Sequence, residues 1–369
     1  MRIKGIFIIS LLLLSLTSCH VARFFYYNFA DMKDYKKFPT QTLNNAEITF
    51  HFSKSSKNLD LNIPSGLNEK NFRTFEQMLD KEKTLSFLII RNDSVIYENY
   101  FHGYDITSIE PSFSMAKSFV SALIGIAIEE KKIKSVHQPI TDFIPELKKN
   151  NGFDKITLEH LLNMRSGIDF NEGYSSPFAD MAKYYYGLNL KKYILSLKTK
   201  KDPDLEYDYI SVNTLLLSLA LEKATGKTVT AYLEEKIWKP LEMEYPASWS
   251  IDSHKDQTVK SFCCINARTH DYAHFGRLYL NKGKWNGKQI VPTEWVNRSL
   301  SIVNDSRDSQ GYPYSYHWRV TVNGAFFAKG VLGQYIFVDP KKNLIIVRTG
   351  RGNGSVAWPH FFELLEQQL

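Results

Sequence analysis

The amino-acid sequence predicts an α/β sandwich, in which helices flank a central antiparallel sheet, with an inserted all-helical domain. Strand-like and helical runs occupy residues 85–129, and strands followed by a closing helix return at residues 325–369. Helical patterns dominate between these blocks, from about residue 131 to 261. Strands and helices on both sides of a helical block are typical of one layered domain that carries an insertion. We expect the α/β domain to comprise residues 66–130 and 262–369, and the helical domain to comprise residues 131–261.

Residues 1–18 have the organisation of a lipoprotein signal peptide. Arg2 and Lys4 form a positive start, and Ile6–Leu16 form an apolar core. That core is too short to span a bilayer, which needs about 20 residues. It ends in Leu-Thr-Ser-Cys, which resembles a bacterial lipobox, so Cys19 is the expected lipidation site. We therefore expect an exported protein of the bacterial cell envelope, lipid-anchored to a membrane; an ordinary secretory signal with a chance cysteine is the alternative.

Residues 19–65 are expected to form a tether and an N-terminal extension. The stretch FFYYNFADMKDYKKFP at 24–39 is too aromatic for a plain flexible linker. It either packs on the folded body or rests at a lipid interface, and the sequence does not distinguish these. Further along, residues 85–101 read as two strands around Asn92-Asp93, which predicts a hairpin.

The bulk composition indicates a globular protein with no nucleic-acid partner. The chain has 369 residues, 43% of them hydrophobic, and its net charge of +7 falls to +5 when Arg2 and Lys4 are removed. A basic, aromatic stretch at 182–201 has apolar residues at helical spacing, which favours a solvated helix with inward tyrosines over a nucleic-acid or membrane patch. Apart from Cys19, the cysteines are Cys263 and Cys264. Adjacent cysteines rarely pair, so we expect no structural disulfide.

The chemistry is predicted to lie at Ser114 and Lys117, the one S-x-x-K match in the chain. The serine stands where a buried helix begins, so unsatisfied N–H groups and the positive helix end favour negative charge there. Lys117 lies three residues on, on the same face of the helix. Apolar neighbours solvate its ammonium poorly, which favours the neutral amine that can accept the serine proton. The alternative is that Ser114 only caps the helix while Lys117 reaches solvent.

A second proton carrier is expected in the loop before another buried helix. Tyr209-Ile210-Ser211-Val212-Asn213 precedes that helix, and a tyrosine there can shuttle protons between Lys117 and a leaving group. Tyr209 is therefore the predicted carrier.

Several motifs together resemble the serine β-lactamase and penicillin-binding-protein superfamily. They are Ser114-Met115-Ala116-Lys117 after the hairpin, ITLEHLLNMRSGIDFNE at 156–172, and RTHDYAHFGRLYLNKGKWNGKQIVPTEWV at 268–296. YISVNT at 209–214 and GVLGQYIFVDPKKNLIIV at 330–347 are most similar to the nylon-oligomer (6-aminohexanoate-dimer) hydrolase and esterase branch.

The resemblance covers roughly residues 70 to 369 in the family's order and implies roles for individual residues. Ser114 would be the acylated nucleophile, Lys117 its base and Tyr209 the proton carrier. Ser211-Val212-Asn213 also resembles the S-x-N form of the second motif, so Ser211 is the alternative carrier.

The resemblance also implies a third motif on a late strand, normally Lys/His-x-Gly. Val331-Leu332-Gly333 occupies it in one register, which leaves no basic residue; Lys329-Gly330 is the other register. In both registers this strand supplies the second oxyanion N–H, and Gln334, after Gly333, is the expected donor.

The predicted activity is hydrolysis of small esters or amides without a cofactor or metal. Without a basic residue at Val331 we expect cephalosporins to be poor substrates. Asn213 and Tyr174 are expected to contact the substrate, Tyr174 as a lid over the acyl chain. No residue in or after the segment SGIDFNEG at 166–173 stands out as a dedicated deacylating glutamate, although Glu172 lies near enough to be considered. The alternative functions are a β-lactamase or D-Ala-type peptidase, and a non-catalytic envelope binding protein.

A zinc site on the helix expected at 268–283 is the main competing interpretation. His270 and His274 are four residues apart, as in zinc-binding helices, but Asp271 replaces the usual glutamate and no third ligand follows. The resemblance instead places this helix on the outside of the sandwich.

Overall fold

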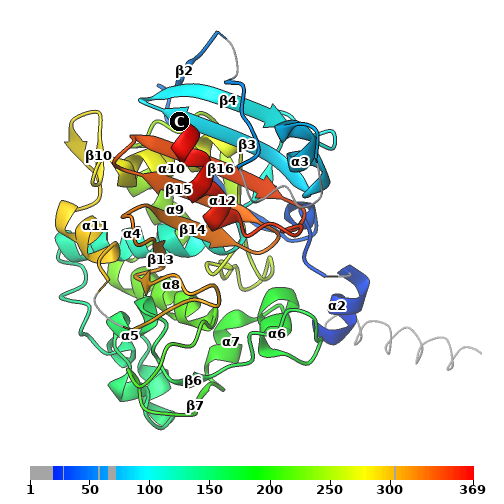
Figure 1. The fold of residues 1–369 in the computed structure, drawn as a ribbon. Helices are drawn as coiled ribbons and strands as arrows, with labels where there is room; N and C mark the ends of the chain where they lie inside the picture. Colours follow the sequence, from blue (N-terminus) through cyan, green and yellow to red (C-terminus); the bar gives the residue numbers. More distant parts are fainter. Residues whose placement is uncertain (1–19, 28, 57–58, 65–71, 303–304) are drawn as a thin grey trace, which may run out of the picture.

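A large, mostly antiparallel sheet forms the centre of the molecule (Figure 1). The structure, a computed structural model, describes residues 20–27, 29–56, 59–64, 72–302 and 305–369. In this part of the chain the sheet has eight strands, in the order β12-β13-β14-β15-β16-β3-β4-β2. Their bounds are β12 Tyr314–Ser315, β13 Trp318–Val320, β14 Phe326–Gly330, β15 Gln334–Asp339, β16 Leu344–Gly350, β3 Thr84–Arg91, β4 Ser94–Tyr100 and β2 Ser53–Lys54. Only the β2–β4 pair is parallel, so the predicted α/β sandwich with an antiparallel sheet is confirmed.

The hairpin predicted around Asn92-Asp93 is formed by β3 and β4. Asn92 and Asp93 have φ values of 52° and 57°. Two successive positive φ angles define the turn that matches the twist of a two-residue hairpin, and asparagine and aspartate tolerate them well.

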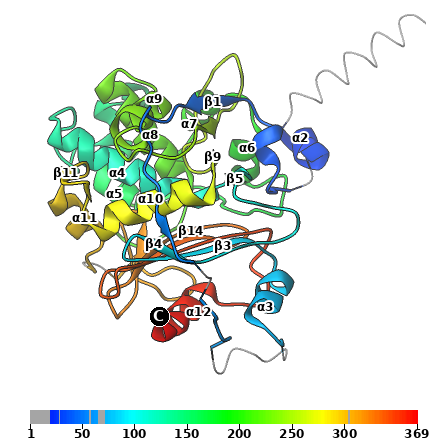
Figure 2. The same cartoon turned by 90° about the horizontal axis from the view of Figure 1, so that it is seen from above.

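Helices cover both faces of the sheet (Figure 2). On one face, α3 (Phe75–Lys81) and α12 (Trp358–Leu365) bury Phe87, Phe337 and Phe362 in a single apolar cluster. On the other face lie α10 (Thr269–Leu280) and α4 (Ala116–Glu129). Gly276 allows α10 to approach closely, because a Cβ there would lie 3.0 Å from side-chain atoms of Ile336 and Ile345.

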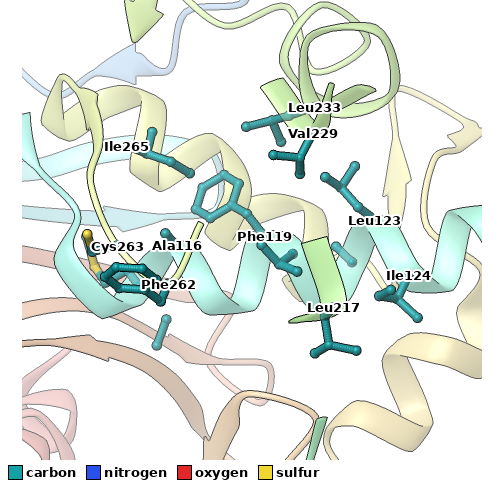
Figure 3. Packing of buried hydrophobic residues seen from close by; sticks show 14 of the residues in the cluster. Ala116, Phe119, Leu123, Ile124, Leu217, Val229, Leu233, Phe262, Cys263 and Ile265 are labelled. Carbon is teal, nitrogen blue, oxygen red and sulfur yellow. The ribbon is translucent and has the colours of Figure 1, made fainter. Parts of the chain in front are cut away.

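The region between residues 131 and 261 contains several helices, but it is not all-helical as predicted, because the short strands β6 (Ile168–Asp169), β7 (Lys198–Thr199) and β8 (Ala247–Ser250) also lie in it. Its helices are α5 Leu158–Leu162, α6 Asp180–Tyr186, α7 Leu190–Ile194, α8 Val212–Thr225 and α9 Val229–Leu233, followed by a π-turn, η6, at Glu234–Trp238. Figure 3 shows how α4 packs against this region through Phe119, Leu123 and Leu217. The tyrosines of α6 are buried, which confirms the inward orientation predicted for them.

The remaining strands are short. A second sheet has the order β1-β8-β9-β5, with β1 Thr40–Leu43, β8 Ala247–Ser250, β9 Ile265–Ala267 and β5 Glu110–Pro111. Two small hairpins pair β6 Ile168–Asp169 with β7 Lys198–Thr199, and β10 Lys284–Trp285 with β11 Lys288–Gln289; α11 spans Thr293–Ser299.

The N-terminal extension packs on the folded body. Helix α2 (His20–Tyr27) lies against α6 at the side of the molecule (Figure 1), and Phe24 and Phe38 are buried. Strand β1 pairs with β8. Of the two alternatives for this aromatic stretch, its buried side chains therefore pack on the folded body. In the described residues, no helix is both long and apolar enough to cross a bilayer.

Helix α10 is central rather than on the outside, which corrects the expectation from the resemblance. It lies between the sheet and the helical region, and His270 and His274 are both buried. His270 bonds to Glu98 and Glu244 at 2.9 and 3.2 Å. Burial lowers the pKa of His270, but these two carboxylates outweigh burial and raise it to about 9. The structure therefore uses this histidine in a buried ionic network.

A buried glutamate ties strand β5, which precedes Ser114, to the main sheet. Glu110 of β5 accepts hydrogen bonds from Thr269 of α10 at 2.5 Å and from Thr349 of β16 at 2.6 Å. Burial raises the pKa of Glu110 to about 7. Because Glu110 lies four residues before Ser114, this cluster fixes the start of the turn that carries Ser114.

Candidate active site

Ser114 lies on a constrained turn between β5 and α4. Phe113–Met115 form a 3-10 turn that runs into the helix at Ala116, so the helix start predicted near Ser114 is confirmed. Phe113 has φ 42°, an unfavourable value for an aromatic residue, and such strain is characteristic of functional sites. Ser112 holds the turn in place, since its N–H donates to Ile265 O at 2.7 Å and its hydroxyl accepts from Ile265 N at 3.1 Å.

Lys117 is buried and joins three separate segments. Its Nζ lies 2.9 Å from Ser114 Oγ, 3.1 Å from Ser211 Oγ and 2.8 Å from the carbonyl oxygen of Phe262. The residue is 1% exposed, which excludes the alternative that Lys117 reaches solvent. The two serine hydroxyls can either donate to this nitrogen or accept from it, whereas the Phe262 carbonyl can only accept.

Ser211, at the start of α8, carries the second hydroxyl that contacts Lys117. It is held by Glu172, whose Oε1 accepts from Ser211 Oγ at 2.5 Å and whose Oε2 accepts from Ser211 N at 2.7 Å. Tyr174 OH donates to the same carboxylate at 2.6 Å. Burial raises the pKa of Glu172, while the charge of Lys117 and the Ser211 hydrogen bonds oppose that rise. Glu172 thus belongs to the site and orients Ser211.

Tyr209, the predicted carrier, lies near the pair in a different way. Lys117 Nζ lies over its ring, 5.1 Å from the centroid, which is a cation–π contact, whereas the contacts of the amine with Ser114 and Ser211 are hydrogen bonds. The ring also packs against Tyr314, at 6.1 Å between centroids. The contacts therefore favour Ser211, the alternative, over Tyr209.

Asn213 and Gln334 are not brought to the site, which corrects two predictions. Asn213 is fully buried and its Oδ1 accepts from Ser166 Oγ at 2.8 Å, inside the helical region. Gln334 is also fully buried: its main chain pairs with Gly330 in the β14–β15 ladder, and its side-chain nitrogen donates to Gly350 O at 2.7 Å. Neither residue lines a cavity that contains Ser114.

The end of strand β14 approaches Ser114 instead, through Gly330. A Cβ at Gly330 would lie 2.5 Å from Ser112 O and 3.1 Å from Ser114 N, so only glycine fits. Gly333 lies in the following turn, where its carbonyl accepts from Arg348 at 2.6 Å. The register with Gly333 at the site is therefore wrong, and the structure selects Lys329-Gly330.

Two cavities meet at Ser114. The apolar cavity has a volume of about 440 Å³ and the polar cavity about 570 Å³. The apolar cavity is lined by Phe29, Ala30, Phe113, Ser114, Tyr174, Ser175, Met181, Ala182, Tyr185, Tyr186, Ser211, Phe262, Cys263, Val331 and Leu332. The polar cavity is lined by Ser114, Tyr174, Tyr207, Asp208, Tyr209, Arg307, Asp308, Ser309, Arg319, Lys329, Gly330, Val331, Leu332 and Asn353. Tyr174 borders both cavities, as a lid over the acyl chain would.

A disulfide between neighbours Cys263 and Cys264 borders the apolar cavity, contrary to expectation. It directly follows Phe262, whose carbonyl holds Lys117. Figure 3 shows Phe262 and Cys263 beside Ala116, where α4 begins. Trp249 Nε1 donates to Cys263 O at 2.6 Å, so this turn is fixed from both sides.

The predicted site residues divide into three groups. Ser114, Tyr174 and Tyr209 line the cavities, and Lys117 contacts Ser114 from behind them. Asn213, Gln334 and Gly333 line neither cavity, and Cys19 lies outside the described residues. The Phe262 carbonyl was missed, and a main-chain acceptor leaves no signal in a sequence. Phe29 and Ala30 were also missed as cavity residues; the aromatic run at 24–39 was the available signal.

Comparison with known proteins gives a consistent picture. The β-lactamase family profile matches residues 72–357. The 6-aminohexanoate-dimer hydrolase of Paenarthrobacter ureafaciens is 25% identical over 307 residues, which cover 77% of this chain and 75% of that protein. A Bacillus anthracis structure provisionally assigned as a 6-aminohexanoate-dimer hydrolase superposes with a TM-score of 0.78 at 24% identity, covering 90% of each chain. A family VIII carboxylesterase superposes with a TM-score of 0.61 at 14% identity, over 78% of this chain and 93% of the other. These two structures share the fold.

The contacts of Lys117 predict which hydroxyl relays its proton. We expect Ser211→Ala to lower kcat about 100-fold or more, the usual effect of removing a proton carrier. Tyr209→Phe keeps the ring over Lys117 and should cost about tenfold or less. Ser218→Ala is the control, because it removes another buried hydroxyl of α8. Steady-state kinetics on one ester, with thermal melting of each variant, give the ranking; the reverse order for Ser211 and Tyr209 would contradict it.

Proposed function

This chain belongs to the β-lactamase family and is a serine hydrolase of amide or ester bonds, and we propose that it works through an acyl-enzyme on Ser114. The observation that carries the proposal is the 2.9 Å contact between Lys117 Nζ and Ser114 Oγ at the meeting point of two cavities. The other two contacts of Lys117 hold its amine on the serine.

The first half of the reaction uses Lys117 as a base. A neutral amine has two N–H donors and one lone pair, so it donates to Ser211 Oγ and the Phe262 carbonyl and accepts the Ser114 proton. Ser114 Oγ then attacks the substrate carbonyl, and the negative oxygen is received by main-chain N–H groups of Ser114 and Val331. Val331 is assigned because Gly330 beside it is the point of closest approach to Ser114.

The second half returns the proton and releases the acyl group. The tetrahedral intermediate collapses, its bond to the leaving oxygen or nitrogen breaks, and the proton held by Lys117 passes through Ser211 to that atom. Water then attacks the Ser114 ester and gives a proton to the same relay. As the acyl–oxygen bond breaks, the relay returns this proton to Ser114 Oγ and the carboxylic acid leaves. Glu172 serves this relay by fixing the position of Ser211.

Turnover of a small substrate panel tests the proposal. Short aryl esters, an amide dimer, a D-amino acid peptide and a chromogenic cephalosporin would be assayed with the wild type, Ser114→Ala and Lys117→Ala. We expect hydrolysis of at least one ester or amide, and a loss of about 1000-fold or more in Ser114→Ala. No turnover of any compound would favour the binding-protein alternative. Undiminished activity in Ser114→Ala would contradict the mechanism.

Lys329 offers a substrate carboxylate the basic partner that Val331 lacks. It lines the polar cavity. Burial and the positive charge of Arg319 lower the pKa of Lys329 to about 8, and the negative charge of Asp308 opposes this shift. Asp308 also pairs with Arg319, at 2.7 Å. Lys329 is therefore charged below pH 8 and can meet a substrate carboxylate there. Val331 no longer predicts poor cephalosporin binding.

We expect an ester that carries a carboxylate to be favoured over its neutral analogue below pH 8, and the preference to fade as pH rises above 8. Lys329→Ala should remove about tenfold of that preference at pH 6.5, as for loss of one charge-assisted hydrogen bond. Lys329→Arg should keep the preference to higher pH. The ratio of kcat/KM values against pH is the measurement, and a ratio that does not change with pH or in Lys329→Ala would refute the role.

We also propose that Cys19 carries a lipid that holds the protein to an envelope membrane. The support is the apolar stretch that ends in Leu-Thr-Ser-Cys. Cys19→Ser should leave the signal peptide uncleaved or release the protein from the membrane fraction. Normal processing together with membrane retention in that variant would argue against a lipid on Cys19.

A further inference from the structure

The exposed aromatic side chains gather in two neighbouring segments. In the part of the chain that the structure describes, the exposed aromatic residues are Phe25, Tyr26, Phe29, Tyr174 and Phe178. Tyr26 and Phe178 are each 82% exposed. Aromatic side chains that cluster on a surface mark an interaction site, whereas scattered ones need no explanation.

These two segments meet at the mouth of the apolar cavity. Phe29 and Tyr174 line the cavity although they are 48% and 45% exposed, so they stand at its opening. At the start of α2, the His20 ring donates a hydrogen bond to the main-chain carbonyl of Pro177, next to Phe178. We call Phe25, Tyr26, Phe29, Tyr174 and Phe178 the aromatic rim.

Helix α2 is fixed to the wall of the cavity. Arg23 Nε donates to Tyr186 O at 2.7 Å, and Phe24 packs edge-on against the Tyr186 ring at 5.4 Å. Tyr185 and Tyr186 line the cavity from the same helix, α6. Figure 2 shows α2 directly beside α6. The N-terminal extension is thus part of the catalytic cavity as well as a tether.

The chemistry of the cavity fits an apolar chain. Its lining has no charged side chain, and apart from three serines it consists of apolar or aromatic residues, including the disulfide at Cys263. Ser114 lies where the apolar cavity joins the polar one, which contains Lys329. A substrate with an apolar acyl chain and a polar leaving group would match both sides.

We propose that the aromatic rim docks this face of the protein onto a lipid surface, and that the substrate is an amphiphilic ester or amide whose acyl chain enters the apolar cavity from that surface. The inference rests on the proposed function and on a lipid at Cys19. That residue immediately precedes α2, so the anchor would attach beside Phe25 and Tyr26. Aromatic side chains are favoured at the boundary between lipid and water, which commits the rim to a bilayer as its occupant.

The test compares two esters of one fluorophore on the full chain. 4-Methylumbelliferyl acetate is soluble, whereas 4-methylumbelliferyl oleate is held in vesicles of phosphatidylethanolamine and phosphatidylglycerol. The rim variant is Phe25→Ser/Tyr26→Ser/Phe178→Ser, which leaves the cavity lining unchanged. We expect it to hydrolyse the acetate within about twofold of wild type and to lose about tenfold or more on the oleate.

The control variant is Ile48→Ser/Leu205→Ser/Val322→Ser, whose parent side chains are 76%, 68% and 88% exposed. It removes three apolar side chains of similar fractional exposure that lie outside the aromatic rim, and it should leave both rates unchanged. An unchanged oleate rate in the rim variant, an equal loss in the control, or equal losses on both esters would each overturn the inference. If the wild-type protein hydrolyses the acetate but not the oleate, this inference alone is overturned. If it hydrolyses neither ester, the proposed function itself is contradicted.

Discussion

The amine of Lys117 is the constraint on which the site depends. It is buried and contacts oxygens of the adjoining turn before α4 and of two segments distant in sequence, the start of α8 and the turn at Phe262. A buried amine without partners would cost several kcal/mol, so the fold must bring these segments together. The helical region and the sheet are thereby locked around one nitrogen atom, and the two cavities open where they meet.

Local patterns in the sequence predicted the features that depend on near neighbours. Ser114 and Lys117 are adjacent on one helix face, and Asn92-Asp93 determines its hairpin through its own backbone preferences. Tyr209 and Ser211 illustrate the limit. They are two residues apart in one loop, and only the rotation of that loop against Lys117 decides which hydroxyl meets the amine.

Tertiary contacts decided what the sequence could not. The run GVLGQ offers two glycine registers, and the close approach of Gly330 to Ser112 and Ser114 separates them. The outer wall of the cavity comes from residues 29 and 30, more than eighty positions before the nucleophile, and no local pattern links the two. The expectation of unpaired cysteines was wrong because it rested on how rarely adjacent cysteines pair in proteins. The turn at Cys263-Cys264 brings both sulfurs together.

The central claim is that Lys117 makes Ser114 the site of a covalent acyl-enzyme. Mass spectrometry of protein quenched during turnover of a slow ester, followed by peptide mapping, tests it most directly. The account predicts a single acyl group on the peptide that contains Ser114, formed at least about 100-fold more slowly in Lys117→Ala. An acyl group on another residue, or labelling of Ser114 at the wild-type rate in Lys117→Ala, would contradict it.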